Sequence, residues 1–382
     1  MTNIAKQVVW TRRGLIAMLY ANRSLRYSAG IVIVMIGAYV AEYEVRKYPQ
    51  ILSSQWQIRE TEKRVKFEVI PDPEVGFRLA PLRQQLIRSH DFSYIRKTDA
   101  KGFVNKEPWP KTSGIIFLGD SLVTGEGVGI EGQFSNLVDQ KLPDQTVVNL
   151  ALPGAGPERQ LRIYRKFGIG LDATLVVACL YLASDLQNDV SFHSWRQQPT
   201  HTSYNDFRLS LHQRLDDRGI AGRILERSRL VSMGWESMRR WFNKEDKRFR
   251  FADGTEILFD SRKLEFAANV VEADDSTLNH MMGSLAQLRS LVSQQKAKLL
   301  VMLIPSKEEI FGVEPTPQDR NAVARLRRRL QDSRMPFLDL YPAIRNGGTL
   351  HSPYFSWDIH LNEYGNRLIA EEFLAWRRRQ AS

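Results

Sequence analysis

Three side chains have the types that nucleophilic catalysis at a carbonyl group requires. Ser121 follows an apolar run in the sequence GIIFLGDS, and His360 lies two residues after Asp358 in the sequence WDIHLNEYG. A serine becomes a nucleophile when a base takes its proton, and a histidine base needs an acid that orients it. These roles depend on geometry and not on order in the chain. Gly-Asp-Ser is by itself a common turn, but together these residues predict a Ser121–His360–Asp358 triad.

The same chemistry needs hydrogen-bond donors for the negative oxygen that develops on the carbonyl group. The backbone N–H groups of Ser121 and of Gly154, in the sequence ALPGAG, are two candidate donors. Ser184 is a candidate third donor in the sequence LASDLQND, with Asn188 a turn later. Two acids accompany these residues. Asp120 could brace the turn or only cap a helix, and Asp185 could order the loop after its strand.

Five apolar runs alternate with helical stretches and supply the elements that would position these residues. They span residues 114–119, 145–152, 173–184, 297–306 and 336–342. Continuous apolar strands separated by helices are typical of a parallel sheet covered on both faces. We predict a doubly wound, flavodoxin-like α/β domain with a five-stranded parallel sheet. The candidate residues then lie at the carboxyl ends of strands, where such sheets bind ligands, or on the loop before the last helix.

Other kinds of site are disfavoured. Gly127, Gly129 and Gly132 satisfy G-x-G-x-x-G, but they come well after the strand, and the second strand ends without the acid that binds a ribose. The single cysteine, Cys179, lies in an apolar run, so it is expected in the core, and neither an intramolecular disulfide nor a cysteine-based metal site can form. The histidines other than His360 show no metal-binding spacing, so no metal site is predicted.

The N-terminal part of the chain predicts a membrane anchor. Residues 27–41 carry no charge, and basic residues are more frequent before them than after them, which places the N-terminus in the cytoplasm. Bulky Tyr39 disfavours cleavage as a signal peptide. The predicted organisation is a basic cytoplasmic N-terminus (1–26), a single-pass anchor (27–43), a stalk and extended lead-in (44–112), and an extracytoplasmic hydrolase domain (113–382), periplasmic in a Gram-negative cell, with a helical insertion (186–290). A soluble protein with an apolar N-terminal helix is the alternative.

The net charge of +11 favours acidic partners such as anionic lipid or acidic polysaccharide. The segment Met238–Phe251 is basic with interleaved aromatic residues, which could stack on nucleic-acid bases. Glu245 and Asp246 interrupt it, so a solvated amphipathic helix is the better prediction and no nucleic-acid partner is expected. Lys307, near the end of the fourth strand, could steer an anionic substrate, but a solvated lysine is the simpler prediction.

The chain resembles the GDSL, or SGNH, family of esterases and lipases over about residues 70–375, apart from the insertion. The sequences FLGDSLVTGEGV, VVNLALPGAG and DIHLNEYGN resemble the family's first, second and last blocks. The resemblance implies acyl transfer through an acyl-serine without a metal or cofactor, with Ser121 as nucleophile, His360 as base and Asp358 as its orienting acid. The third block departs from the family, which has Asn-Asp where this chain has Ser184–Asp185. A lost oxyanion donor costs about 10²–10³ in rate, and Asn188 is the candidate replacement.

The resemblance therefore implies an ester hydrolase of the cell envelope. An O-acetylated glycan is the first expected substrate class, and a lipid is the second. Two alternatives remain open, because the residues do not show whether water or a sugar hydroxyl resolves the acyl-enzyme. One is an O-acyltransferase that acts on a polysaccharide with the same triad. The other is a catalytically weak module that binds envelope polysaccharide. The sequence does not define the oligomeric state.

Overall fold

The computed structural model describes residues 68–311 and 317–381, except 90, 182, 199–201, 216–247, 252–253 and 260–274, together with isolated residues between 35 and 47. The predicted cytoplasmic N-terminus, most of the predicted anchor and residues 48–67 of the predicted stalk lie outside these residues. The isolated residues between 35 and 47 are helical. Within the described part, no helix combines the length and the apolar character that crossing a bilayer requires. One compact unit comprises residues 60–215 and 246–382 and contains every helix and strand named below.

A parallel sheet of five strands forms the centre of this unit. The strands are β5 (Ile115–Leu118), β6 (Val147–Asn149), β7 (Leu175–Tyr181), β10 (Lys298–Ile304) and β11 (Phe337–Asp339). Their order across the sheet is β11-β10-β7-β5-β6, and every neighbouring pair is parallel. Counted along the chain, this is the 2-1-3-4-5 order of flavodoxin-like folds, which bind ligands where the strand order reverses. The prediction of a five-stranded doubly wound sheet is confirmed, and the reversal lies between β5 and β7.

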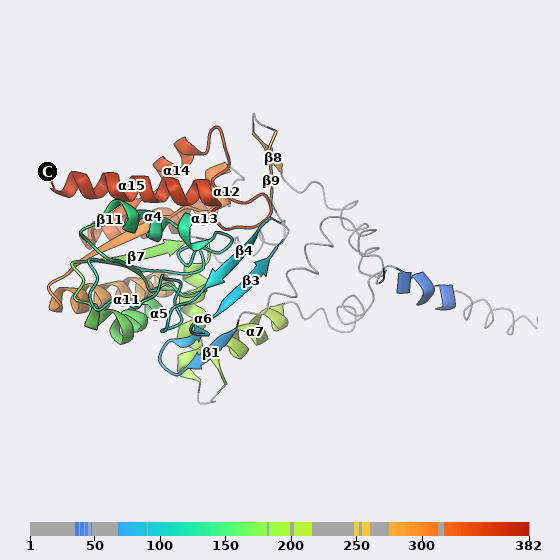
Figure 1. Ribbon diagram of the computed structural model, residues 1–382, viewed down its shortest axis with the longest axis horizontal. Coiled ribbons are helices and arrows are strands. Elements are labelled where there is room, and N and C mark those ends of the chain that lie inside the picture. The colour runs from blue at the N-terminus through green and yellow to red at the C-terminus, as the bar shows by residue number, and fades with distance from the viewer. Residues whose placement is uncertain are drawn as a thin grey trace, which may run out of the picture. The chain divides into compact units, whose positions relative to one another are not determined.

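Alternate side chains of each strand enter two separate cores, which explains why the strands are apolar throughout. In β5, Ile116 and Leu118 enter one core, and Ile115 and Phe117 enter the other. The first core is closed by α5 (Pro157–Ile163), α11 (Asp275–Gln294) and α13 (Pro317–Asp332), and the second by α4 (Phe134–Lys141), α14 (Tyr341–Gly347) and α15 (Glu363–Ala381). Figure 1 shows α15 and α4 above the strands and α11 and α5 below them. Cys179 is fully buried in the second core, as expected.

The segment expected as an extended lead-in forms two antiparallel hairpins before the sheet. They are β1 (Val69–Asp72) with β2 (Gly76–Leu79), and β3 (Gln84–Arg88) with β4 (Ser93–Lys97). Arg159 of α5 is fully buried and ties the first hairpin to the loop after β6, because it donates to the carbonyl oxygens of Val75, Phe77 and Pro153 at 2.7, 2.9 and 2.7 Å. Burial lowers the pKa of Arg159 to about 9.

The described part of the insertion is helical at its start and contains one further hairpin. Its elements are α6 (Asp185–Gln197), α7 (Tyr204–Leu215), β8 (Arg248–Arg250) and β9 (Glu256–Leu258). The prediction of an amphipathic helix over Met238–Phe251 is wrong for Arg248–Arg250, because Arg250 pairs with Glu256 on β9 and the ring of Phe249 packs against Phe311. Short helical turns complete the fold: η2 (Ile130–Gly132), η3 (Tyr164–Gly168), η4 (Ile169–Leu171) and α12 (Lys307–Phe311).

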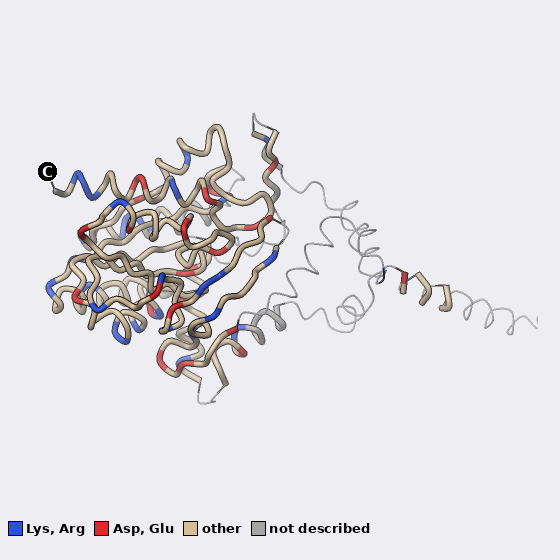
Figure 2. Tube along the Cα trace, viewed as in Figure 1, with Lys and Arg blue, Asp and Glu red and all other residues tan. Residues whose placement is uncertain are grey.

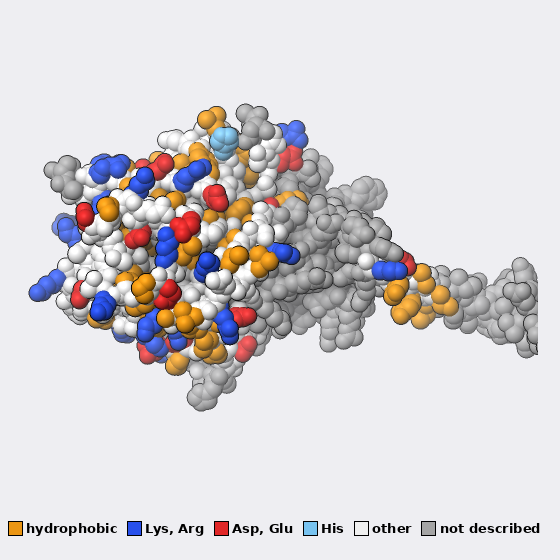
Figure 3. Space-filling model, in the orientation of Figure 1, with side chains coloured by type: hydrophobic (Ala, Val, Ile, Leu, Met, Phe, Trp, Pro, Cys, Tyr) orange, Lys and Arg blue, Asp and Glu red, His pale blue; other side chains and the backbone are white. Residues whose placement is uncertain are grey.

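Charged residues are spread along the described elements. Figure 2 shows Lys and Arg interspersed with Asp and Glu on the strands and helices of this unit. On the face drawn in Figure 3, basic, acidic and hydrophobic side chains are likewise mixed. On this face the positive charge is therefore distributed and forms no continuous basic stripe.

Candidate active site

The fold brings Ser121, His360 and Asp358 into one hydrogen-bonded chain. Ser121 lies in the turn directly after β5, at the point where the strand order reverses. Its Oγ is 2.8 Å from Nε2 of His360, and Nδ1 of His360 is 2.5 Å from Oδ1 of Asp358. The side chains of His360 and Asp358 are 13% and 16% exposed, so the base is largely shielded but can be reached. This arrangement allows His360 to take the proton of Ser121 while Asp358 holds the imidazole ring.

The electrostatic surroundings of His360 favour its protonated form. Burial alone would lower its pKa, but the charge and hydrogen bond of Asp358 act in the opposite direction. Glu126 and Asp120 add smaller contributions of the same sign, and the net effect is a pKa above the ordinary value of 6.5. A histidine with a raised pKa is a stronger base and stabilises the imidazolium that forms when the serine attacks.

Two side chains that sequence reasoning did not assign to the site hold the loop that carries Asp358 and His360. Lys307 is 1% exposed, and its Nζ donates to the carbonyl oxygens of Phe355, Ser356 and Asp358 at 2.9, 2.8 and 3.2 Å. The prediction of a solvated lysine is therefore wrong, because the carbonyl groups of the loop replace water around its charge. Asp91 accepts hydrogen bonds from the backbone N–H groups of Trp357 and Asp358 at 2.7 and 2.6 Å.

A buried ion pair of Arg96 and Glu126 lies near enough to the triad to affect the charge of His360. Arg96 of β4 is paired with Glu126, and their side chains are 4% and 7% exposed. Arg96 also donates to the hydroxyl group of Tyr94 at 2.9 Å. The charge of Glu126 contributes to the raised pKa of His360, and Arg96 of the β3–β4 hairpin is the ion-pair partner of Glu126. Glu126 lies in the block FLGDSLVTGEGV, but no motif marks Arg96.

The second side of the site contains the predicted backbone donors. Among the described residues, no protein group accepts a hydrogen bond from the backbone N–H of Ser121 or of Gly154. Gly154 has a φ of +69°, which favours glycine. A Cβ atom there would lie 2.6 Å from Nη1 of Arg208, so this guanidinium group of α7 packs directly on Gly154. Arg208 is a further residue of this region that sequence reasoning did not identify.

Ser184 and Asn188 lie next to each other, and the hydrogen bonds that their side chains donate differ in number and length. The amide group of Asn188 donates to Oγ of Ser184 and to Oδ1 of Asp185, both at 3.3 Å. The hydroxyl group of Ser184 faces Oδ2 of Asp120 at 3.5 Å, a long contact. The amide hydrogens of Asn188 are therefore engaged, whereas the hydroxyl group of Ser184 is held only weakly. No hydrogen bond joins either side chain to Ser121 among the described residues.

Asp120 and Asp185 are buried acids that brace the two loops. Asp120 accepts from the backbone N–H of Leu122 at 3.0 Å, and Asp185 accepts from the backbone N–H of Tyr181 at 2.9 Å. Burial raises the pKa of both carboxyl groups, and for Asp185 the nearby charge of Asp120 raises it further. These two residues order the turn after β5 and the end of β7.

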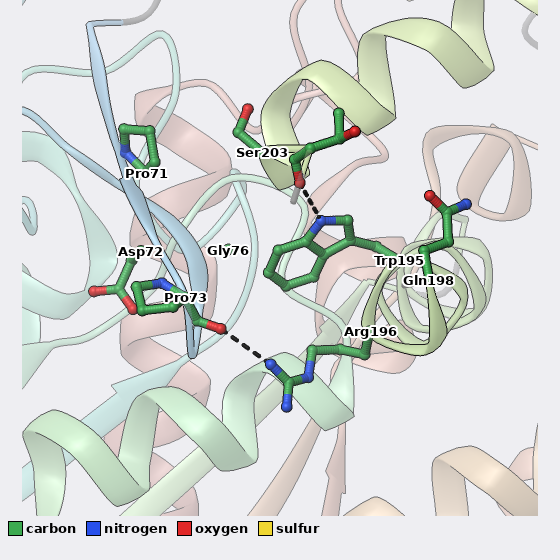
Figure 4. A pocket seen from close by; sticks show the side chains of 9 residues that line it. Pro71, Asp72, Pro73, Gly76, Trp195, Arg196, Gln198 and Ser203 are labelled. Carbon is green, nitrogen blue, oxygen red and sulfur yellow. Dashed lines mark hydrogen bonds between the residues drawn. The ribbon is translucent and has the colours of Figure 1, made fainter. Parts of the chain in front are cut away.

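A pocket of about 410 Å³ lies between the turn of the β1–β2 hairpin and the end of α6, and no triad residue lines it. Figure 4 shows the ring of Trp195 in this pocket, with Pro71 and Pro73 across from it. The indole N–H of Trp195 donates to the carbonyl oxygen of Thr202 at 2.8 Å, and Arg196 donates to that of Pro73 at 3.0 Å. The pocket therefore presents an aromatic side chain held in place by the insertion.

No family model and no curated protein sequence matches this chain. Solved structures similar to it include a GDSL-like lipase from Bacteroides thetaiotaomicron, with 12% identity, a TM-score of 0.36, and coverage of 72% of this chain and 93% of the lipase. An acetyl xylan esterase has 14% identity, a TM-score of 0.35, and coverage of 68% and 98%. An esterase from Pseudoalteromonas sp. has 12% identity, a TM-score of 0.34, and coverage of 71% and 99%.

These identities and TM-scores are low, so what this chain does has to be inferred from its own residues. The similar region extends over most of the chain, since these three structures match between 68% and 72% of it. By their own descriptions, the structural neighbours of this chain are lipases and esterases, among them members of the G-D-S-L family.

Proposed function

We propose that this protein is a serine ester hydrolase. The single observation that carries the proposal is the continuous chain of hydrogen bonds from Ser121 Oγ through both ring nitrogens of His360 to Asp358. An Asp-x-His pair without a catalytic role would not be expected to place a ring nitrogen within hydrogen-bond distance of a serine at the carboxyl edge of a sheet. The arrangement is the one that acyl transfer through a covalent acyl-serine requires.

In the proposed reaction, Ser121 Oγ attacks the ester carbonyl carbon and its proton passes to Nε2 of His360. The bond between the carbonyl carbon and the alcohol oxygen then breaks, and His360 returns the proton to the departing alcohol. Water enters, loses a proton to His360 and attacks the acyl carbon. The bond between this carbon and Ser121 Oγ then breaks, His360 returns the proton to Ser121, and the carboxylic acid leaves. Asp358 keeps the other ring nitrogen protonated throughout, so the ring presents its lone pair to Ser121.

We propose that the oxyanion is held by the N–H groups of Ser121 and Gly154 and by the hydroxyl group of Ser184. Asn188 would act on Ser184 and not on the substrate, because its amide already donates to the serine oxygen at 3.3 Å. This bond leaves the Ser184 hydrogen available, and the 3.5 Å contact with Asp120 is weak enough to be exchanged for the oxyanion. Ser184 and Asn188 would then jointly replace the asparagine of the family's third block.

For the substrate, we propose an O-acetylated acidic glycan of the cell envelope, with an acylated lipid as the second candidate. The guanidinium group of Arg208 on Gly154 places a cation beside the proposed oxyanion hole, where a uronate or phosphate of the substrate would be attracted. The exposed part of Trp195 offers a surface on which a sugar ring can pack. The net charge of +11 favours the same class of partner.

We further propose that residues 27–43 anchor the protein in the membrane with its catalytic domain outside the cytoplasm. The uncharged run at residues 27–41 and the basic residues before it support this orientation. Protease treatment of intact spheroplasts that express a C-terminally tagged chain should remove the tag. A tag that stays protected until the cells are lysed would contradict the proposal.

The function is tested on the purified full-length chain with p-nitrophenyl esters of increasing chain length and with O-acetylated polysaccharides. We expect acetate release that Ser121→Ala abolishes while its circular dichroism stays that of the wild type. Adding a deacetylated polysaccharide distinguishes hydrolysis from transfer, because a transferase would move the acetyl group to the acceptor. A folded wild type that releases nothing and is not phosphonylated at Ser121 by a fluorophosphonate probe would contradict the esterase proposal and favour a binding module.

A further inference from the structure

A cluster of histidine and carboxylate side chains lies outside the triad, on three helices of one sheet face. Glu158 belongs to α5, His193 to α6 and His280 to α11. One carboxylate oxygen, Oε2 of Glu158, is 3.0 Å from Nδ1 of His193 and 3.2 Å from Nε2 of His280. The centroids of the two imidazole rings are 4.2 Å apart, and the ring planes are tilted by 53°. Three potential metal-binding atoms therefore converge on one point, within 4.8 Å of one another.

Two of the distances between these atoms match those between the ligands of a tetrahedral metal ion. Zinc binds nitrogen and oxygen ligands at about 2.0–2.1 Å, so two ligands of one tetrahedral zinc lie about 3.3 Å apart. The distances of 3.0 and 3.2 Å from Glu158 to the two histidines are close to this value. Two imidazole nitrogens and a carboxylate oxygen are ligands that suit zinc and similar divalent transition metals.

A buried carboxylate beside the cluster supplies an independent observation. Asp189 is fully buried, and its Oδ2 accepts no hydrogen bond from any described residue. This oxygen lies 3.6 Å from Nε2 of His280, which is too long for a hydrogen bond but brings it to the edge of the cluster. Its other oxygen accepts from the backbone N–H of Glu158 at 2.6 Å, which fixes the side chain. A buried carboxylate oxygen without a donor is costly unless a proton or a cation neutralises it.

The neighbouring side chains fit the role of supports for metal ligands. Arg162 donates to Oε1 of Glu158 at 3.1 Å and leaves Oε2 to the histidines. The amide group of Gln197 is 2.7 Å from Nε2 of His193. Metal-bound histidines usually donate their other N–H group to such a partner, and the amide oxygen of Gln197 accepts it after a flip of the amide, whose two ends are hard to distinguish. His193 and His280 are 40% and 30% exposed, so an ion can enter.

We propose that Glu158, His193, His280 and Asp189 form a structural site for one divalent transition-metal ion, with zinc as the preferred metal. Helix α6 leads into the insertion and α11 leads back to the sheet, so the ion would close the base of the insertion. The ion would also link α6 and α11 to α5, whose N-terminus follows the loop that contains Gly154. The metal site would therefore stabilise the helices next to the oxyanion side of the candidate active site. It does not depend on the proposed esterase activity.

The test uses the full-length protein after dialysis against a chelator. We expect one equivalent of Zn²⁺ to bind, measured by isothermal titration calorimetry and by elemental analysis, and to raise the melting temperature. His193→Gln and His280→Gln should each weaken binding by about 100-fold, a ligand being worth at least as much as a supporting residue. His351→Gln, a change of an exposed histidine outside the cluster, should leave binding unchanged. Mg²⁺ and Ca²⁺, which prefer oxygen ligands, should not compete.

A second measurement needs no variant and therefore does not depend on how the variants fold. Diethyl pyrocarbonate modifies accessible histidine side chains, and mass spectrometry locates the modified positions. Zn²⁺ should protect His193 and His280 selectively and leave His351 reactive. The proposal is overturned if the wild type binds no zinc, or if zinc binds with equal affinity to both cluster variants and protects neither histidine.

Discussion

The candidate active site has two sides that are built in different ways. On the acid–base side, Asp358 and His360 share one loop whose backbone is held by buried Lys307 and by Asp91. On the oxyanion side, the proposed donors come from separate loops after three strands, and side chains of the helices α6 and α7 lie beside them. Ser184 and Asn188 bond to each other there, and Arg208 packs on Gly154. The loop of the first side is held by two side chains. On the second side Asp120, Asp185 and Arg159 likewise hold the backbone of the loops, and side chains of α6 and α7 lie against these loops in addition.

This difference separates the residues that carry out proton transfer from the residues that can recognise the substrate. A proton relay tolerates little displacement. The loop that carries Asp358 and His360 is accordingly held by hydrogen bonds of its backbone to two side chains. The oxyanion side borders the insertion, where the side chains of Ser184 and Arg208 can differ without disturbing the relay. We therefore expect substitutions on the acid–base side and of the proposed oxyanion donors to affect every ester alike, and a substitution of Arg208 to affect some substrates more than others.

The largest effect is expected for Asp358→Asn. The amide would favour the wrong imidazole tautomer, and kcat should fall by about 10⁴. The acid limb of the pH profile should shift as well. The base works only when neutral, so wild-type activity should be lost as the pH falls through the His360 pKa, which lies above 6.5. Without the charge of Asp358, that pKa should drop and the limb should move to lower pH. Residual kcat/KM measured between pH 4 and 9 checks both effects.

An unchanged acid limb in Asp358→Asn would show that another group sets the protonation of His360. Glu126→Gln is the matched variant, because Glu126 contributes a smaller charge effect and does not bond to the ring. It should move the limb in the same direction by less.

A smaller loss is expected for Ser184→Ala on the oxyanion side. Removal of one oxyanion donor costs about 10²–10³ in kcat. Asn188→Ala should cost less, because it removes the support of that donor and not the donor itself. The double variant should be no worse than Ser184→Ala if the two act in series. Additive losses in kcat would instead mean that Asn188 contacts the oxyanion independently.

The fold could be predicted from the sequence because its signal is local. The apolar runs of β5, β7 and β10 enter two cores, so no polar face interrupts them. The position of Ser121 follows from the end of β5, and that of Asp358 and His360 from the loop before α15. The helix predicted over Met238–Phe251 is wrong at Arg248–Arg250, because residue spacing does not reveal that Arg250 meets Glu256 on the opposite strand. The predicted anchor remains a prediction.

The residues that sequence reasoning missed all owe their roles to distant partners. Lys307 has an ordinary position at a helix start, and only the loop around Ser356 makes it a buried support. The pairing of Glu158 with His280 joins positions 122 residues apart. No residue spacing encodes such contacts, and a single sequence offers no second signal for them.

Lys307→Met tests the acid–base side separately, because it weakens the support of the loop that carries Asp358 and His360 and changes no triad residue. The change removes the hydrogen bonds of a charged donor to three partly buried carbonyl groups, and a hydrogen bond to a charged group is worth about 1.5–3 kcal/mol. We expect a marked fall in melting temperature. At temperatures where the variant is fully folded, kcat should be about tenfold lower with unchanged KM, because the loop no longer holds His360 in place. Lys298→Met, at the exposed first residue of β10, is the control. A wild-type kcat in folded Lys307→Met would show that the loop keeps its geometry without the lysine.

The smallest effect is expected for Arg208→Gln, and it bears most directly on the substrate. If the guanidinium group attracts an anionic substituent, its loss should raise KM for an O-acetylated acidic polysaccharide by about fivefold, the worth of roughly 1 kcal/mol from one partly exposed charge pair. KM for the uncharged p-nitrophenyl acetate should not change, because the relay and the backbone donors remain. Added salt should reduce the difference between wild type and variant, since screening weakens exposed charge pairs. An equal change in KM for both esters would mean that Arg208 shapes the oxyanion hole through Gly154, and the preference for acidic glycans would then need another source.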